Sequence, residues 1–416
     1  MRKKVLIPIF NRAHYGRLRS VLDAIKKHPQ LELQLMVGVP AAYDHFLTNI
    51  RNSRPNSWLS ALPWYFRARL LSIIDFFKPG TILKNDFLSR GILNDGYAID
   101  ARVSLFLDGG MSETMAKSVG LGIMGIVDEL KRLKPDVVFV NADRFEMMAV
   151  ALAASYLNIP IAHNEGGDIS GTLDESVRHA ITKLSHVHFT ATEASRKRVL
   201  QMGENPKFVF TVGSPPIDII KQLDLKLPSD FAPGLDADKP FLLVLLHPVA
   251  TESKESNAKM AREVIGAIEA LDMPTLLLGS NIDAGSDEVG KIIRQWHDSR
   301  KLPNIFFTKH LQPNDFYRAL AKTACAIGNS SSFIREGAYF GTPAVVVGSR
   351  QQNRDRGKNV KDAGIEADEI KKAIQSQIKH GRYPSDKLFG NGSTGLAIAD
   401  ALAKVSPQIQ KEFHEV

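Results

Sequence analysis

The sequence predicts an α/β protein with two consecutive parallel sheets, each covered by helices on both faces. Short apolar runs alternate with amphipathic stretches along nearly the whole chain, an alternation typical of parallel strands joined by helices. The alternation stops once, in the Pro-, Asp- and Gly-rich segment 223–239, and then begins again. The length of 416 residues also exceeds what one ordinary core accommodates.

Each expected strand is a short apolar run, and each expected helix repeats apolar side chains every three or four positions. In the first half we expect strands at 5–10, 33–39, 137–140, 160–163, 187–191 and 208–212, with helices at 16–27, 120–134, 146–156, 175–185 and 193–202. In the second half we expect strands at 241–246, 275–278, 305–308, 325–328 and 344–347. These two series predict two Rossmann-like domains, with ligands bound in the cleft between them at the carboxyl ends of the strands.

The domain boundaries follow from this division. We expect an N-terminal domain at 1–220, a linker at 221–239, a C-terminal domain at 240–390, and a final helix in 391–416 that packs back on the N-terminal domain. Residues 49–100 do not follow the rhythm and contain the basic, apolar run WLSALPWYFRARLLSIIDFFK. This insertion has three open interpretations: peripheral membrane contact through 58–78, a cover over the active site, or a helical hairpin packed on its own domain or on a second subunit.

Composition excludes several classes of protein. The net charge of +8 favours an anionic partner, but the basic residues are scattered, which argues against nucleic acid. The single cysteine, Cys325, excludes an internal disulfide and a cysteine-rich zinc site, and its apolar neighbours predict burial. Histidine spacing suggests neither a metal nor another cofactor. Because the sequence lacks a long apolar span and a signal peptide, we expect a cytoplasmic enzyme.

One apparent motif is set aside. Gly120, Gly122 and Gly125 spell G-x-G-x-x-G, but a dinucleotide site requires a strand immediately before these glycines. Here the preceding residues already look helical. Close packing of a helix is therefore the better interpretation.

Candidate site residues follow the expected strands. Arg12 comes after the first strand, where a guanidinium can bind phosphate. Asp143 and Arg144 follow the strand at 137–140, although Asp143 also suits a helix cap. His247 follows the first strand of the second half and can bind phosphate or donate a proton.

The stretch from His163 to His179 is the richest in charged groups. Four carboxylates lie within eleven residues, beside two histidines and an arginine, which exceeds what helix capping needs. Neighbouring carboxylates shift each other's pKa apart, so that one can act as a base and another as an acid. The candidates in this stretch are His163, Glu165, Asp174, Glu175, Arg178 and His179.

The second half carries a Ser-rich turn at the start of a helix, after the strand at 325–328. Hydroxyls and free N–H groups at such a turn form a cradle for a diphosphate, although Ser-rich turns are also ordinary caps. A carboxylate one turn later is placed to hold ribose hydroxyls. The nucleotide-side candidates are Ser330, Ser331, Ser332, Glu336, Arg350 and Arg354.

Together these motifs resemble the hydrolysing UDP-N-acetylglucosamine 2-epimerases. The resemblance runs from about residue 4 to 360, outside 49–100, and is densest over HNEGGDISGTLDESVRHAITKLSHVHF and GNSSSFIREGAYFGTPAVVVGSRQQNRDRG. The D-E-S-x-R-H run is similar to the sialic-acid-pathway branch, which releases UDP and free N-acetylmannosamine.

The resemblance implies the glycosyltransferase-B arrangement of the two domains, a UDP-sugar substrate and a homodimer. It implies elimination of UDP to a glycal, followed by addition of water. Acid and base roles fall on Asp143, Glu165 and Asp174, with His247 beside them. The other candidates would bind substrate: the serines the diphosphate, Glu336 the ribose, and Arg12 the phosphates from across the cleft.

The sequence departs from the family where the sugar is expected. Asn11 and His14 replace a Thr and an acid after the first strand, and Ala142 replaces the Gly before Asp143. We therefore hypothesise a modified sugar, such as a deoxy or diacetamido one. The alternatives are a non-hydrolysing 2-epimerase, a UDP-sugar glycosyltransferase of the same architecture, and a nucleotide-sugar-binding protein without catalysis.

Overall fold

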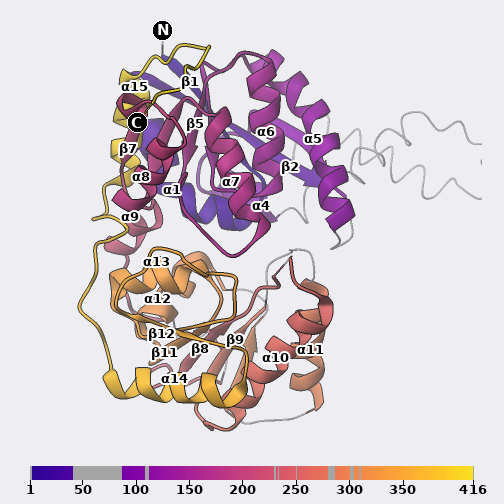
Figure 1. Ribbon diagram of the computed structural model, residues 1–416, viewed down its shortest axis with the longest axis vertical. Coiled ribbons are helices and arrows are strands. Elements are labelled where there is room, and N and C mark those ends of the chain that lie inside the picture. The colour runs from indigo at the N-terminus through magenta and orange to yellow at the C-terminus, as the bar shows by residue number, and fades with distance from the viewer. Residues whose placement is uncertain are drawn as a thin grey trace, which may run out of the picture.

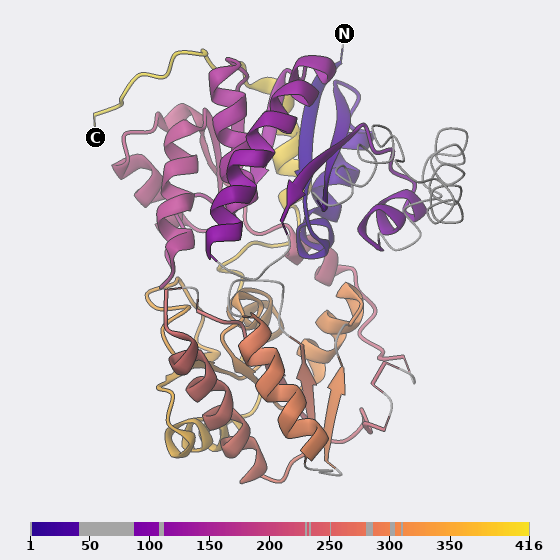
Figure 2. The same ribbon diagram turned by 90° about the vertical axis from the view of Figure 1, so that its right-hand side faces the viewer.

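The computed structural model describes residues 2–40, 87–107, 112–228, 231–232, 234–249, 251–279, 286–299, 304–308 and 311–415. Two parallel sheets with flanking helices lie one above the other, as Figures 1 and 2 show. This arrangement confirms the predicted fold class of two Rossmann-like α/β domains.

The N-terminal sheet has the strand order β3-β2-β1-β4-β5-β6-β7, and its strand pairs are all parallel. Its strands are β1 (Lys3–Ile9), β2 (Leu31–Pro40), β3 (Ala101–Phe106), β4 (Val137–Asn141), β5 (Ile161–Asn164), β6 (Val187–Thr190) and β7 (Val209–Thr211). In this sheet the sequence analysis missed β3. This edge strand alternates buried and half-buried residues, so it lacks the continuous apolar run that marks the central strands.

Helices cover both faces of this sheet. On one face α1 (Arg12–Lys27), α4 (Phe87–Asn94) and α15 (Thr394–Lys404) share a core, and on the other α5 (Ser112–Leu133), α6 (Phe145–Tyr156) and α7 (Leu173–Leu184) share another. The shorter α8 (Glu193–Gln201), η2 (Pro206–Phe208) and α9 (Pro216–Lys221) complete the domain. The three glycines of the G-x-G-x-x-G run lie inside α5. A Cβ on Gly122 would come 2.0 Å from Leu105, which confirms a packing role.

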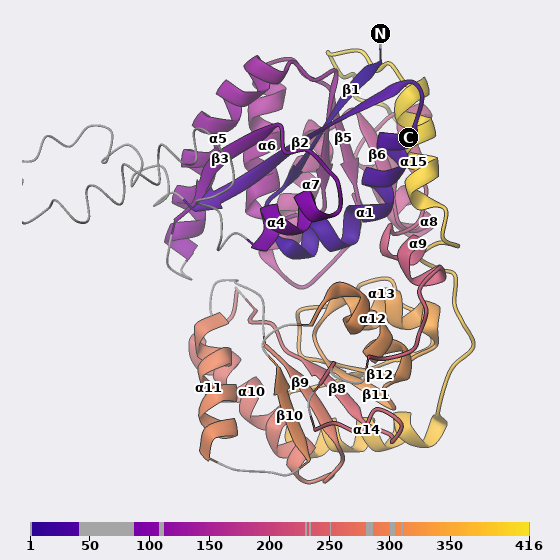
Figure 3. The same cartoon turned by 180° about the vertical axis from the view of Figure 1, so that it is seen from behind.

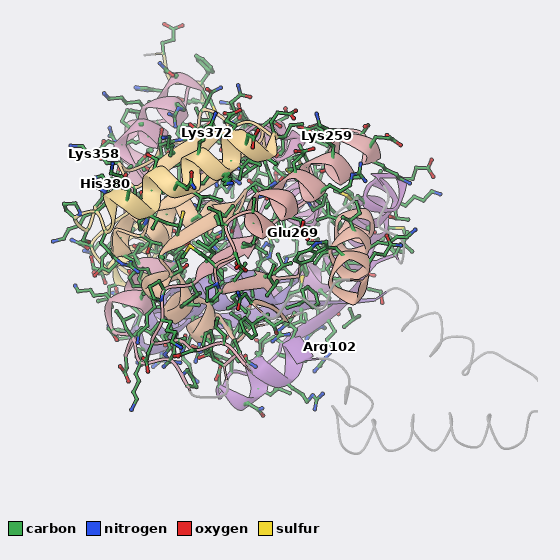
Figure 4. All side chains as sticks on the ribbon, turned by 90° about the horizontal axis from the view of Figure 1, so that it is seen from below. Arg102, Lys259, Glu269, Lys358, Lys372 and His380 are labelled. Atoms are coloured by element: carbon green, nitrogen blue, oxygen red, sulfur yellow. The ribbon has the colours of Figure 1, made fainter. Side chains whose placement is uncertain are left out.

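The C-terminal sheet has the order β10-β9-β8-β11-β12-β13 and is also parallel throughout. Its strands are β8 (Leu242–Leu245), β9 (Thr275–Leu278), β10 (Ile305–Thr308), β11 (Cys325–Gly328), β12 (Ala344–Val347) and β13 (Val360–Ala363). The helices α10 (Lys254–Glu269), α11 (Ser286–Ser299) and α14 (Ala367–His380) share one core. Figure 4 shows α14 beside α10 at the outer end of the molecule, with Lys372 and Lys259 labelled on them.

The other face of this sheet carries α12 (Pro313–Lys322) and α13 (Ser331–Phe340). Cys325 is fully buried in β11, as its apolar neighbours predicted. After α14 the chain returns to the N-terminal domain, where α15 lies along α1 (Figure 3). The buried carboxylate of Asp218 accepts hydrogen bonds from the backbone N–H groups of Thr394 and Gly395, at 2.8 and 2.7 Å, and so caps α15.

The last residues of the predicted insertion pack on their own domain. Leu88 and Ile92 of α4 and the following Tyr97 join the core under α1. Lys26 of α1 donates a hydrogen bond to the carbonyl of Gly96 at 2.7 Å. Segment 58–78, for which peripheral membrane contact was one interpretation, lies outside the described residues. Across the part of the chain that is described, every helix is too short or too polar to cross a membrane.

The contact between α15 and α1 predicts a stability difference between two Gly→Ala variants. A Cβ on Gly395 would lie 2.5 Å from the Ser20 carbonyl oxygen, so Gly395→Ala forces the helices apart and should cost about 1–3 kcal/mol. Gly120 is exposed in α5 with nothing within 4 Å of its Cβ position, so Gly120→Ala should stabilise by about 0.5–1 kcal/mol. Thermal unfolding of both variants checks this. Equal midpoints would contradict it.

Candidate active site

The strand order places the site. In each sheet the order reverses beside the first strand, between β1 and β4 and between β8 and β11. Ligands of doubly wound sheets bind outside the carboxyl ends of the strands at such switch points. The sequence motifs beginning at Asn11, Asn141, His247 and Asn329 follow these four strands directly.

Glu165 is the most strongly held carboxylate of the site. It follows β5, is buried, and adopts a left-handed backbone with φ of 63°. Its Oε1 lies 2.6 Å from Arg17 of α1 and 2.5 Å from Arg335 of α13, an ion pair that joins the two domains. Burial alone would raise the pKa of Glu165, but the two guanidinium groups outweigh it and hold the pKa at about 2.

Asp143 pairs with Arg178, so two residues predicted for the site do meet. The Arg178 side chain is almost fully buried, and its Nη1 donates to the backbone carbonyl of Asp168 at 2.6 Å. Burial lowers the pKa of Arg178. The Asp143 carboxylate therefore supplies the opposite charge that a buried guanidinium requires.

His163 does not reach a ligand position. It is fully buried, with Nε2 2.8 Å from the carbonyl oxygen of Ala142 and Nδ1 3.1 Å from the Thr182 hydroxyl. Burial lowers its pKa to about 3, so the ring is neutral. Both ring nitrogens therefore hydrogen-bond within the protein and fix the turn before Asp143, and substrate binding by His163 stays a prediction.

The first turn of α7 presents Asp174 and Glu175. Glu175 accepts a hydrogen bond from the backbone N–H of Ser170 at 2.5 Å and lies 3.8 Å from His179. Burial lowers the pKa of His179. Glu175 thus ties the acidic loop to the helix, while Asp174 stands half-buried at the helix start.

Two further arginines of the predicted site lie at helix starts. Arg12 is exposed at the first residue of α1. Arg144 lies 3.1 Å from the fully buried carboxylate of Glu146 and over the ring of Phe145. Arg144 therefore neutralises a buried acid of its own helix.

On the C-terminal side, Asn329 connects the strand ends. Its amide accepts from the backbone N–H of His247 at 2.7 Å and donates to the His247 carbonyl at 2.8 Å. The backbone carbonyl of Asn329 accepts hydrogen bonds from the side chains of Arg350 at 3.1 Å and Gln351 at 2.9 Å. Asn329 and Gln351 had no predicted role, although both lie inside the motifs that were singled out.

The Ser-rich turn begins α13 as expected. Ser330 is the N-cap and accepts from the backbone N–H of Ser332 at 3.4 Å, while Ser331 and Ser332 are half-buried in the first turn. Glu336 is buried one turn later, and burial raises its pKa. Among the described residues its Oε2 has no hydrogen-bond partner, so it can accept from a ligand hydroxyl.

Arg354 reaches across from the C-terminal domain. Its Nε donates to the Ile169 carbonyl at 3.3 Å, and its Nη2 lies 3.7 Å from Asp168. Burial lowers the pKa of Arg354 to about 10, so the group stays charged. Within the described ranges no cluster of three or more His, Cys, Asp and Glu side chains suits a metal ion, and the cations of the site are arginines.

The site thus has carboxylates on the N-terminal side and a helix start with arginines on the C-terminal side. Helix N-termini and guanidinium groups bind phosphates, and paired carboxylates move protons. This combination is typical of α/β enzymes of glycosyltransferase-B architecture that act on nucleotide-activated sugars.

The chain belongs to the UDP-N-acetylglucosamine 2-epimerase family, whose sequence profile matches residues 84–403. The UDP-N,N'-diacetylbacillosamine 2-epimerase (hydrolyzing) of Legionella pneumophila is 37% identical over 302 residues, 72% of this chain and 79% of that protein. The UDP-N-acetylglucosamine 2-epimerase of Neisseria meningitidis serogroup B is 27% identical over 403 residues, 94% of this chain and 92% of that protein.

Solved structures agree on the fold. The UDP-GlcNAc 2-epimerase of Methanocaldococcus jannaschii, in complex with UDP-GlcNAc and UDP, superposes with a TM-score of 0.72 at 18% identity, covering 96% of this chain and 99% of that one. The Neisseria meningitidis enzyme bound to UDP-GlcNAc gives a TM-score of 0.70 at 17% identity, covering 97% and 100%.

The ion pairs of Glu165 predict a pH effect. Replacing Arg17 with Met leaves the buried carboxylate less compensated, so the pKa of Glu165 should rise from about 2 toward its ordinary value near 4.3. If ionised Glu165 is essential, the acid limb of the kcat/KM profile should move to higher pH. Arg19→Met on the same helix is the control, because Arg19 pairs with Asp95 at a partly exposed position. Identical acid limbs for the two variants would contradict the prediction.

Proposed function

We propose that the protein is a hydrolysing 2-epimerase of a UDP-linked diacetamido sugar, of the N,N'-diacetylbacillosamine type. The reaction would release UDP and the free sugar inverted at carbon 2. The observation that carries this proposal is the set of three carboxylates Asp143, Glu165 and Asp174. The first two follow the adjacent strands β4 and β5, the third lies in the first turn of α7, and Arg335 of α13 pairs with Glu165 from the other domain.

The chemistry requires a base, because the hydrogen at carbon 2 is only weakly acidic. The base takes this proton, the C–H electrons form a C1=C2 double bond, and the C1–O bond to the diphosphate breaks. UDP leaves as an anion, and a glycal remains. Water then adds its oxygen to C1 and gives one proton to a carboxylate base, while an acid delivers a proton to C2 from the opposite face.

The nucleotide side would stabilise the leaving group. Ser330, Ser331, Ser332 and the free N–H groups of α13 would hold the diphosphate, and the Glu336 carboxylate would accept from the ribose. The arginines that pair with the acids, Arg17, Arg335 and Arg178, are the cations for which a diphosphate competes. When they turn to phosphate, the carboxylates lose their partners and become stronger bases.

Two findings favour a modified sugar. The names of the relatives from Legionella pneumophila and Campylobacter jejuni, 37% and 31% identical, specify N,N'-diacetylbacillosamine. The sequence departures also lie on the sugar side. Asn11 caps α1 by accepting from the backbone N–H of His14, and Ala142 keeps the left-handed φ of 61° that glycine prefers. The turn is thus preserved while its side chains have changed.

The observations argue more strongly against some alternative functions than against others. Family membership favours an epimerase over a glycosyltransferase, and a binding protein would have no need of three acids at the strand ends. A non-hydrolysing epimerase remains the second candidate, because the relatives include UDP-N-acetylglucosamine 2-epimerases whose names do not specify hydrolysis. A homodimer and a cytoplasmic location stay predictions.

A proton NMR time course in deuterated water tests the proposed reaction. UDP-N,N'-diacetylbacillosamine should give UDP and a free 2-epimeric sugar with deuterium at carbon 2. UDP-N-acetylglucosamine should turn over at least about tenfold more slowly, since missing sugar contacts cost on the order of 1–3 kcal/mol. A product that keeps its UDP would establish the non-hydrolysing reaction instead, and equal turnover of both substrates would refute the sugar assignment.

The three acids predict matched losses of activity. Asp143→Asn, Glu165→Gln and Asp174→Asn should each lower kcat by about 100-fold or more, because each removes a proton-transfer group. Glu113→Gln is the control, since Glu113 also lies in the first turn of a helix, α5, but is exposed and outside the site. Full activity in all three site variants would remove the basis for these roles.

A further inference from the structure

A loop of the C-terminal domain docks on the N-terminal domain beside the site. This loop, 349–356, follows β12, and its Asp355 is held entirely by residues around the start of α8. Arg198 approaches Asp355 Oδ1 at 2.6 Å and Oδ2 at 3.2 Å, and the Thr192 hydroxyl donates to Oδ2 at 2.7 Å. Such a forked guanidinium–carboxylate pair is among the stronger polar contacts in proteins.

The same turn of α8 also holds the acidic loop. Thr192 is the N-cap of α8, and the Ser195 hydroxyl donates to Asp168 at 2.8 Å. Arg198 donates to the carbonyl of Gly167 at 3.1 Å as well as to Asp355. The start of α8 therefore connects Asp355 to the loop that carries Glu165.

The two loops also meet directly. The backbone N–H of Gly171 donates to the carbonyl of Arg350 at 3.1 Å, and a Cβ on Gly171 would lie 2.0 Å from the Ser349 carbonyl oxygen. The approach is so close that only glycine fits. The 349–356 loop is thus seated on the segment that leads into Asp174.

Asp355 stays charged in this position. Burial would raise its pKa, but the hydrogen bonds from Arg198 and Thr192 outweigh burial and lower it. Separating the domains would leave a half-buried carboxylate without its partners, so the pair resists opening of the cleft.

We propose that Asp355 and Arg198 form a latch that keeps the two domains closed until water has added to the glycal. The proposal rests on the proposed function. Once UDP has left the sugar, the glycal carries no phosphate to hold it, and an open cleft would release it before hydration. Asp355 and Arg198 are positioning residues, since they act through the two loops and do not touch the sugar.

The chain provides a matched control in the ion pair of the next residue, Arg356. Arg356 pairs with the exposed Asp362 of its own domain, so Asp362→Asn removes an ion pair from the same loop without affecting the contact between domains. The test compares Asp355→Asn, Arg198→Met, the double variant and Asp362→Asn. Proton NMR measures two products, the free glycal and the hydrated sugar, and their ratio is compared at equal amounts of released UDP.

The latch predicts that both single variants raise this ratio by roughly tenfold, as loss of a charge-assisted pair allows. The ratio for the double variant should be no higher than that for either single variant, because the two residues act as one unit. Asp362→Asn should match the unchanged enzyme. If Asp355→Asn only slows turnover and leaves the ratio unaltered, Asp355 has a merely structural role and the latch is refuted.

A second measurement separates the latch from the proposed reaction. If the unchanged enzyme releases no UDP from the sugars tested, the proposed function fails, and X-ray scattering with saturating UDP still tests the latch. The radius of gyration of Asp355→Asn should then exceed that of the unchanged enzyme and of Asp362→Asn. Equal radii for all three would overturn the proposal.

Discussion

The buried carboxylate of Glu165 is the point on which the two domains and the site depend together. One of its oxygens faces a guanidinium from α1 and another from α13, at 2.6 and 2.5 Å. A buried charge without partners is costly, so removing either arginine leaves the carboxylate with less compensation. The closed arrangement of the domains and the ionised state of Glu165 therefore support each other.

Two residues with a strained backbone, Ala142 and Glu165, position the acids at the ends of β4 and β5. Ala142 and Glu165 follow adjacent strands, and both adopt left-handed conformations with φ of 61° and 63°. Non-glycine residues take this conformation at a cost and keep it only where their surroundings enforce it. Here His163 enforces it, since its ring binds the Ala142 carbonyl on one side and Thr182 of α7 on the other. A neutral, buried histidine thus orients the turn that carries Asp143.

The two halves of the candidate site differ in composition. The C-terminal half has the elements that phosphate recognition needs: a strand end, a Ser-rich turn, a helix start and arginines from the next loop. The N-terminal half has the three acids Asp143, Glu165 and Asp174. Relatives named for N,N'-diacetylbacillosamine and for N-acetylglucosamine both occur at moderate identity, which fits a shared diphosphate chemistry with variable sugar contacts.

The amino-acid sequence alone was enough to predict the fold class, the two series of strands, and the charged motifs at strand ends. These features are local, because apolar runs and turn residues set them within a few positions. The edge strands β3 and β13 escaped prediction: β3 is buried only on alternate residues and β13 is exposed at its two middle residues, so neither has a continuous apolar run. Which charges meet depends on the folded chain. Arg17 and Glu165 are 148 residues apart in the chain, and Arg198 and Asp355 are 157 apart. No local sequence pattern encodes such pairs. The burial of His163 is likewise not a local feature, because it depends on α7, which follows His163 in the sequence and packs over it in the fold.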